Sequence, residues 1–455
     1  MSRTVIEKGY VIPVHSDEII EDGVVAFDDA KITYVGPRNK FDGEAFRADK
    51  VIDAGGKAVL PGLVNTHTHL IGAYIKALTE DVVGKEKGDA AGLYKRAFPV
   101  VEAVKPDDHY WGDMTHALEM LMTGTTTISN TWTEEANAGT VVKDLGIRAV
   151  LSEMVFGIKL TKLSATAMER PFNNEMAARY LDAAEKLHGN WHNKENGRIT
   201  TRISPGGPGY CSDDTLEKCR DLAKKLGVGI NIHIAEVPGE TEFIQKRYGM
   251  RPMELGKKLG LLGPDTIGFH MVFLTDSDID ILAETGTKFS HTSFHTPKRG
   301  YFPPMEKVYA RKVDVSFGSD WTSNDLWKFM RAGIMIPRAR SGDVGMLTAT
   351  DALRMCTLGG ARALGMEKQI GSLEVGKKAD VIVLDVSKPW YQPIYQPNLV
   401  SNIIWNSNGS DVTDVFVDGR QIVKDREVTT VDRAAIQKET QRRAQLIWAE
   451  ASKHW

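Results

Sequence analysis

Histidine and aspartate side chains stand at the ends of several short apolar segments of this sequence, where they could act together on one ion. The run that begins at Ala58 ends in His67 and His69, which are separated by a single residue. In a strand, residues i and i+2 point to the same face, with Cα atoms about 6–7 Å apart. These two imidazoles can therefore bind the same metal ion. Five of the 12 histidines end such segments, and with one aspartate they form the set His67, His69, His233, His270, His291 and Asp320.

Each member of this set also has a simpler explanation. An isolated His-X-His pair is usually a surface or core feature, and a lone histidine at a strand end can be a hydrogen-bonded core residue. Asp320 could cap the helix that follows it. Scattered histidines would not be expected to share one kind of position, so the joint placement favours a metal site.

The segments that carry these residues alternate between helix and strand patterns. Apolar residues recur at helical spacing from Leu216 to Leu226, Gly227 is suited to end that helix, and VGINIHI is typical of a strand. The same pattern predicts eight strands, near residues 58–66, 124–131, 148–156, 199–204, 228–234, 266–271, 287–292 and 313–319. Eight alternating units predict an α/β fold, a (β/α)8 TIM-like barrel. The alternative is an open doubly wound sheet, but no glycine fingerprint for a dinucleotide follows the first strand.

The two ends of the chain share another pattern. Residues 22–36 are typical of two short strands around a turn at Asp28-Asp29, and similar strands recur at 379–385 and 414–423. These strands could pair into one small β-sandwich domain built from both termini. The predicted division is 1–57 and 369–430 for the sandwich, 58–368 for the barrel, and 431–455 for a C-terminal helix that packs on the barrel or on another subunit.

Composition narrows the functional classes. The chain has 455 residues, of which 42% are hydrophobic and 26% charged, as in an ordinary globular protein. A net charge of −3 argues against broad attraction to nucleic acid or membranes. Residues 1–20 lack a basic segment followed by an apolar core, and the three cysteines form no CxxC pair. We therefore expect a cytoplasmic protein with reduced thiols and without a nucleic-acid or membrane partner.

Taken together and in order, these motifs resemble the amidohydrolase superfamily. The matching features are PGLVNTHTH, HIAE at 233–236, His270, SHTS at 290–293 and GSDWTSND at 318–325. The segments at 348–365 and 370–385 also look like the C-terminal part of that family. The resemblance is closest to the branch that contains methylthioadenosine/S-adenosylhomocysteine deaminases and chlorotriazine hydrolases.

The resemblance implies a site with one metal ion. Imidazole and carboxylate ligands suit zinc, and iron or another divalent ion would also fit. Family members with two metals usually carry a modified lysine after strand four, whereas RITTRIS followed by PGGPGY offers none. The implied ligands are His67, His69, His233 and Asp320.

The resemblance also implies roles in catalysis. Asp320 would accept a proton from the metal-activated water, and His270 would hydrogen-bond the water and the developing tetrahedral centre. Glu236 lies three residues beyond His233 and could protonate a ring nitrogen or the leaving group. His291 is expected to contact substrate or a ligand rather than the metal.

Loops after the strands set substrate choice, and here the chain departs from adenosine-type deaminases. Those proteins tend to carry an HCPxSNxKL-like segment after strand seven, where this chain has HTSFHTPKR from His291. Predicted substrate-binding residues are His291, Phe294, His295, Trp132 and Trp321, and further aromatic candidates are Tyr74, Tyr301 and Trp327. Several aromatic side chains would suit a flat, apolar substrate, although each alone could be a packing residue.

The sequence thus predicts a hydrolase in which metal-activated water displaces an amine, or a similar group, from an sp² carbon of a small molecule. Deamination of an N-heterocycle is the first hypothesis, and hydrolysis of a urea, carbamate or amide bond by the same site is the second. A third hypothesis is a binding or assembly protein that has lost catalysis. We also expect a homo-oligomer.

Overall fold

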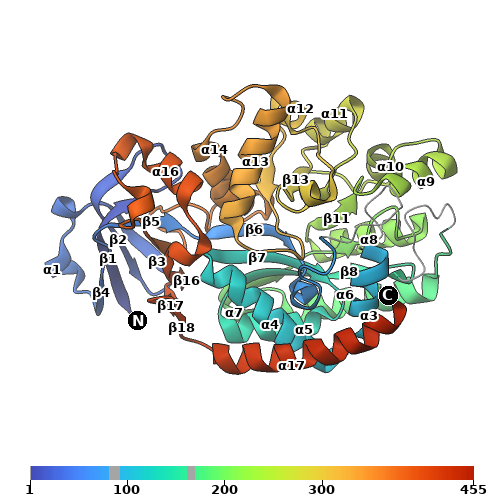
Figure 1. Cartoon of the computed structure of the whole chain (residues 1–455), viewed down its shortest axis with the longest axis horizontal. Helices are drawn as coiled ribbons and strands as arrows, with labels where there is room; N and C mark the ends of the chain where they lie inside the picture. Colours follow the sequence, from blue (N-terminus) through green and yellow to red (C-terminus); the bar gives the residue numbers. More distant parts are fainter. Residues whose placement is uncertain (1, 81–92, 161–169) are drawn as a thin grey trace.

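The computed structural model describes residues 2–80, 93–160 and 170–455, which form a mixed α/β fold. Strands from both ends of the chain lie at one side of the molecule, and parallel strands with their helices make up the rest (Figure 1). Among the described residues, no helix combines the length and the apolarity needed to cross a bilayer.

The terminal sheet joins segments that are far apart in sequence. It has nine strands in the order β18-β17-β16-β15-β5-β1-β2-β3, with β4 beside β1. The two ends of the chain meet where β5 pairs antiparallel with β15, with Val59 opposite Val383. Pairing between the two ends was expected, whereas a sandwich remains a prediction. The bounds are β1 Arg3–Val11, β2 Ile20–Asp28, β3 Lys31–Pro37, β4 Lys50–Asp53, β5 Lys57–Pro61, β15 Val381–Asp385, β16 Val412–Val417, β17 Arg420–Lys424 and β18 Glu427–Val428.

The remaining strands form two parallel sheets. The first contains β6 Leu63–Thr68, β7 Thr125–Trp132, β8 Arg148–Val155, β9 Ile199–Thr201 and β10 Ser204–Pro205. The second contains β11 Ile230–Ile234, β12 Thr266–His270, β13 Lys288–His291 and β14 Val315–Phe317. Isolated parallel bridges link the sheets at both sides, between Ile203 and Ile230 and between Thr68 and Asp320. The carboxyl ends of β6 and β14 therefore lie next to each other.

Helices separate most of these strands in sequence. They include α3 Phe98–Ala103, α4 Pro106–Met122, α5 Glu135–Leu145, α6 Asn174–Trp191, α8 Asp213–Leu226, α9 Pro238–Tyr248, α11 Asp276–Thr285 and α13 Leu326–Ser341. Helix α8 matches its prediction: Ser212 caps its first turn, and Leu216 and Cys219 are buried. Gly227 ends it in the left-handed conformation, at φ 66°, which glycine adopts without steric cost.

The predicted single strand at 58–66 is wrong, because the apolar run contributes to two sheets. Residues Lys57–Pro61 belong to the terminal sheet, and Leu63–Thr68 belong to the first parallel sheet. The chain crosses between the sheets at Gly62, whose backbone N–H donates to the carbonyl of Asp380. A Cβ atom at this position would lie 2.0 Å from Oγ1 of Thr126, so only glycine fits the crossing. The strand predicted at 199–204 is likewise divided, into β9 and β10.

A buried ion pair connects the terminal sheet to the parallel strands. Arg148, at the start of β8, donates to both carboxylate oxygens of Asp380 at 2.8 and 2.9 Å and to Asp418 at 2.6 Å. The side chains of Arg148 and Asp380 are only 1% and 2% exposed. Because both partners are present, the cost of burying the charges is offset by their mutual attraction.

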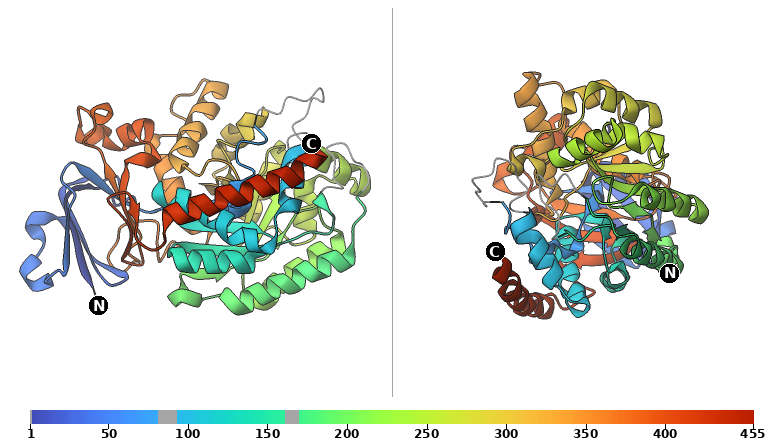
Figure 2. Two further views of the ribbon diagram at one scale, coloured as in Figure 1. Left: turned by 60° about the horizontal axis from the view of Figure 1, so that its bottom comes forward. Right: turned by 90° about the vertical axis from the view of Figure 1, so that its right-hand side faces the viewer.

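The C-terminal helix, α17 Arg433–Ala451, runs along the outside of the parallel-strand region (Figure 2). Its buried face contacts α4, where the hydroxyl groups of Thr440 and Thr115 are 2.7 Å apart. Nε1 of Trp448 donates to the carbonyl of Tyr74, which lies in the segment that follows β6. The sequence predicted that this helix packs on the barrel or on another subunit. In the structure it packs against helices and loops of its own chain.

Candidate active site

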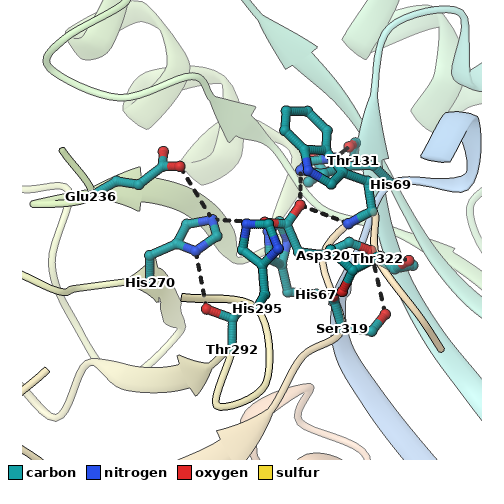
Figure 3. Close-up of polar contacts among 12 residues, drawn as sticks. His67, His69, Thr131, Glu236, His270, Thr292, His295, Ser319, Asp320 and Thr322 are labelled. Carbon is teal, nitrogen blue, oxygen red and sulfur yellow. Dashed lines mark hydrogen bonds and ion pairs between the residues drawn. The ribbon is translucent and has the colours of Figure 1, made fainter. Parts of the chain in front are cut away.

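Four histidines and an aspartate from distant parts of the chain converge at the carboxyl ends of the parallel strands, and all of them except His233 are labelled in Figure 3. His67 lies on β6 and His69 directly follows it, His233 lies on β11, His270 ends β12, and Asp320 lies just beyond β14. Potential ligand atoms of His67, His69 and Asp320 lie within 4.8 Å of one another, and so do those of His67, His233 and His270. His67 thus belongs to both groups and lies at the centre of the cluster.

The nitrogen atoms of this cluster fit a metal ion. His67 is fully buried, and both of its ring nitrogens lack a hydrogen-bond partner among the described residues. Nδ1 of His233 is also buried without such a partner. An unpartnered buried nitrogen is costly unless something binds it. Burial lowers the pKa of His67 and His233 well below its usual value, so both rings are neutral and can donate lone pairs.

The orientation of His69 is fixed by the neighbouring strand. Its Nδ1 contacts the carbonyl oxygen of Thr131, at the end of β7, which leaves Nε2 facing the cluster. Nε2 lies 3.4 Å from Oδ1 of Asp320. A backbone carbonyl on the second nitrogen is the usual means of holding a ligating imidazole in one tautomer.

Asp320 is held in an unusual backbone conformation. Its φ is 59°, and its Oδ1 accepts a hydrogen bond from the backbone N–H of Trp321 at 2.8 Å. Oδ2 lies 3.0 Å from Nε2 of His295. Burial raises the pKa of Asp320, but the neighbouring His295, His270 and His69 together outweigh burial and hold the pKa well below its usual range. The carboxylate is therefore ionised and has two differently occupied oxygens.

His270 lies between two carboxylates. Its Nε2 is 3.8 Å from Oε1 of Glu236 and 3.7 Å from Oδ2 of Asp320, and its Nδ1 is 3.2 Å from Oγ1 of Thr292. Burial lowers the pKa of His270 to about 3, which makes the ring neutral at physiological pH. A neutral ring can donate one hydrogen bond and accept another.

Glu236 follows β11 and faces this histidine. Its backbone N–H donates to Oε2 of the buried Glu240 at 2.9 Å, which fixes the turn into helix α9. Its carboxylate, with 11% of the side chain exposed, lies 3.7 Å from Nη1 of Arg299. The loop after β10 also supports this region: a Cβ at Gly207 would lie 2.1 Å from the carbonyl oxygen of His233. The absence of a side chain there allows close contact with β11.

A cavity with about 350 Å³ of empty space, part of it open to solvent, lies beside the cluster. Its polar end is lined by His69, His233, Glu236, His270 and Asp320. Two indoles, Trp132 and Trp321, adjoin that end with ring centroids 5.9 Å apart. The rest of the described wall consists of Leu93, Phe98, Met154, Phe156, Leu160 and Tyr210.

Only some of the residues predicted to bind substrate line this cavity. Trp132 and Trp321 line the cavity, and His295 contacts Asp320 behind it. His291, Phe294 and Tyr301 do not line the cavity, and their role in binding stays a prediction. Two aromatic candidates have structural partners: Tyr74 donates to the carbonyl of Asp108, and Trp327 donates to that of Thr123.

The apolar wall was not predicted from the sequence. Met154 lies on β8 and Phe156 directly follows it. The only feature of the sequence that could have indicated their place at the cavity was therefore their position at the end of a strand. Apolar side chains at strand ends are more often core residues, however, and residue type alone does not separate the two cases.

Comparison with known proteins agrees with the motifs. A sequence model described as the amidohydrolase family matches residues 58–422. The 5-methylthioadenosine/S-adenosylhomocysteine deaminase of Moorella thermoacetica is 35% identical over 439 residues, which cover 95% of this chain and 96% of that protein.

Two solved structures share the fold over nearly the whole chain. An adenosine deaminase from Xanthomonas campestris with bound zinc has a TM-score of 0.87 and 28% identity, covering 98% of this chain and 99% of that one. The atrazine chlorohydrolase of Arthrobacter aurescens TC1, complexed with zinc, has a TM-score of 0.83 and 22% identity, covering 97% and 100%. The second likeness concerns the fold alone.

Proposed function

Because this chain belongs to the amidohydrolase family, as its motifs predicted, we propose that it is a metal-dependent hydrolase that deaminates an N-heterocycle. The observation that carries the proposal is the convergence of His67, His69, His233 and Asp320 beside Glu236 and His270. The deaminase names of the Moorella thermoacetica and Xanthomonas campestris proteins support the same reaction class.

The finer architecture is part of the proposal. We infer that the two parallel sheets close into a (β/α)8 barrel within the predicted range 58–368, since bridges link them at both sides; the first residues of that range, up to Pro61, belong to the terminal sheet instead. Residues 1–57 and 369–430 would form the β-sandwich domain, followed by the helical segment 431–455. The site would then occupy the carboxyl face of the barrel, where the catalytic residues of such barrels lie. A homo-oligomer and a cytoplasmic location stay predictions from the sequence.

One divalent ion, zinc in the first instance, would be held by His67, His69, His233 and Asp320. The unpartnered nitrogens of His67 and His233 support this assignment, as does the bound zinc in the Xanthomonas campestris structure. When bound, such an ion lowers the pKa of a coordinated water to roughly 7 and so makes a nucleophile available at neutral pH. The cavity has no lysine among its described lining residues, which supports one ion rather than two.

Side chains of the protein would carry out the proton transfers. Oδ2 of Asp320 accepts a proton from the attacking water. In the tautomer in which Nδ1 of His270 accepts a hydrogen bond from the hydroxyl of Thr292, Nε2–H can donate to the oxygen atom bonded to the developing tetrahedral carbon. The carboxyl group of Glu236 protonates the ring nitrogen. Asp320 then passes the proton taken from water to the amino group, the carbon–nitrogen bond to that group breaks, and the hydroxyl group of the tetrahedral centre returns its proton to Glu236. The products are ammonia and the corresponding oxo-heterocycle.

Hydrolysis of an N-substituted urea or carbamate is the second candidate. Two observations favour it: the apolar wall of the cavity, and the loop after β13, where His295 rather than a small polar residue approaches Asp320. The same proton transfers would apply, but Glu236 would protonate a departing amine.

The decisive experiment is a substrate screen on zinc-loaded protein with metal analysis. Ammonia release from aminated purines, pterins or triazines would support deamination. Activity restricted to ureas or carbamates would support the second candidate. A protein that retains no metal after reconstitution, with no activity on either panel, would indicate a binding or assembly function instead.

A further inference from the structure

The cavity beside the candidate metal site has two chemically different ends, and the apolar end constrains the substrate. On the basis of the proposed function, we propose that the substrate is an uncharged, planar nitrogen compound that carries an alkyl or aryl substituent in place of a sugar or an amino-acid tail. The substituent would occupy the wall formed by Phe98, Met154, Phe156 and Leu160.

The apolar end is built from buried side chains of several elements. Phe98 begins α3, Met154 lies on β8, and Phe156 follows β8, with exposed fractions of 3%, 3% and 2%. Phe156 packs edge-to-face against Trp132 and Tyr210, with centroid distances of 5.9 and 6.0 Å. Rings held in this way form a firm apolar surface that favours alkyl or aryl groups.

The described lining offers few groups for a hydroxylated substituent. Its ionisable side chains are those assigned above to metal binding and proton transfer, apart from the phenol of Tyr210. A ribose would bring several hydroxyl groups to the apolar wall, and a carboxylate would bring a charge. Burying either without a hydrogen-bonding partner is unfavourable, whereas burying methylene groups is favourable.

The polar end does offer hydrogen-bond donors to a planar head group. The indole nitrogens of Trp132 and Trp321 are buried and have no hydrogen-bond partner among the described residues. These residues are 4% and 7% exposed, and both line the cavity. An indole N–H is a donor only, so a ring nitrogen or a carbonyl oxygen would satisfy it. A flat head group with acceptor atoms would supply the partner that these two indole N–H groups lack among the described residues.

Two kinds of compound share this chemistry: alkylated amino-heterocycles and N-aryl ureas. In the first arm, zinc-loaded protein is given adenines that carry methyl, ethyl, propyl, butyl or benzyl groups on the sugar-bearing nitrogen, with adenosine for comparison. In the second arm it is given N-phenyl ureas with dimethyl or diethyl substitution. Ammonia and aniline report the two arms separately.

We expect kcat/KM to rise roughly fourfold for each added methylene until the wall is filled. Adenosine should be poorer than butyladenine by roughly tenfold or more, because the apolar part of the described lining offers no partners for its hydroxyl groups. A preference for adenosine over every alkyladenine, with no activity on the ureas, would overturn the proposal.

Binding measurements with compounds that cannot react test the apolar-wall assignment independently of the proposed deamination. The purines that lack the amino group, with the same alkyl chains or ribose, cannot release ammonia, and their affinities are measured by calorimetry. If alkylpurines bind more tightly than purine riboside but no compound is turned over, the proposed reaction fails and the assignment of the apolar wall stands. If ammonia is released and purine riboside binds more tightly, the reaction stands and the apolar assignment fails.

A variant at the apolar wall tests whether this wall causes the preference for longer alkyl chains. Phe156→Ser should reduce the alkyl-chain preference to about twofold or less per methylene while metal content is retained. The matched control is Phe302→Ser, because Phe302 is 40% exposed and does not line the cavity. Leu160→Asn is a second variant in case Phe156→Ser does not fold. An unchanged preference in a folded, metal-containing variant would overturn the proposal.

Discussion

Nε2 of His295 lies 3.0 Å from Oδ2 of Asp320, on the side of the carboxylate away from the backbone N–H of Trp321 that binds Oδ1. Oδ1 is also the oxygen that lies 3.4 Å from Nε2 of His69. The two oxygens thus have different neighbours: Oδ1 accepts a hydrogen bond from the backbone of Trp321, whereas Oδ2 has a close contact with Nε2 of His295 that does not have hydrogen-bond geometry. His295 is therefore placed next to the residue that we assign both to metal binding and to proton transfer.

Replacing His295 by alanine should lower turnover and metal affinity by roughly 10- to 100-fold, because the partner of Oδ2 is lost. Turnover is measured with the best substrate of the screen, and metal affinity by competition with a chelator. His15→Ala is the matched control, since His15 is exposed. Wild-type values of both quantities in His295→Ala would show that the contact with Asp320 has no functional role.

Replacing Glu236 by glutamine should reduce kcat by roughly 10²- to 10⁴-fold, because the amide cannot transfer the proton that the departing group needs. The side-chain volume is retained, and Glu236 is not among the proposed ligands, so the metal-to-protein ratio should not change. Stopped assays for ammonia and elemental analysis measure the two effects. Glu18→Gln, at an exposed position, is the control. Full activity in Glu236→Gln would remove this residue from the mechanism.

Part of the site could be predicted because metal binding restricts residue type and position together. His67 and His69, two residues apart at the end of an apolar run, meet both conditions, and so do His233 and Asp320 at later strand ends. Such positions share one edge of a parallel sheet, and they converge when the first and last strands meet, so the prediction depended on the barrel fold class but not on the loops.

Other features could not be predicted, because they depend on contacts between distant segments. The run at 57–68 does not indicate that Gly62 separates two sheets, since apolar residues stand on both sides of it, at 58–60 and at 63–64. Met154 and Phe156 have the residue types of an ordinary core, and only the fold places them against a cavity. The contact of His295 with Asp320 depends on the course of the loop after β13, which residue spacing does not determine.

Removing the metal should destabilise the protein, because it leaves the buried nitrogens of His67 and His233 without partners. An ion present at 100 times its Kd stabilises the folded state by about 2.7 kcal/mol. We therefore expect a Tm lowered by several degrees after chelation and restored by zinc. His67→Ala should have low metal content and no such response to zinc. Equal melting temperatures of the loaded and chelated wild type would argue against a metal in this cluster.

Replacing Arg148 by methionine should lower the free energy of unfolding by about 3–5 kcal/mol, because it leaves the buried carboxylate of Asp380 without its partner. Lys218→Met is the matched control: it also breaks a 2.8 Å ion pair, with Asp214, but both side chains are more than half exposed. That change should cost less than about 1 kcal/mol. Urea unfolding measures both. Arg148 begins β8, at the end opposite the site, so kcat of folded Arg148→Met should be unchanged.

The buried carboxyl group of Glu240 should make stability depend on pH. Burial raises its pKa from 4.5 to about 7 in the folded protein. Between those values the unfolded chain has released the proton while the folded protein keeps it, so stability falls as pH rises, by about 1.4 kcal/mol per pH unit from this group alone. The contribution is fully present below pH 4.5, and the fall ends near pH 7. Glu240→Gln keeps an oxygen acceptor for the backbone N–H of Glu236 but does not titrate. Urea unfolding of both proteins at pH 5, 6, 7 and 8 should therefore give curves that diverge at the low end and run parallel above pH 7. A constant difference between the two proteins across this range would mean that Glu240 does not change its protonation state on unfolding.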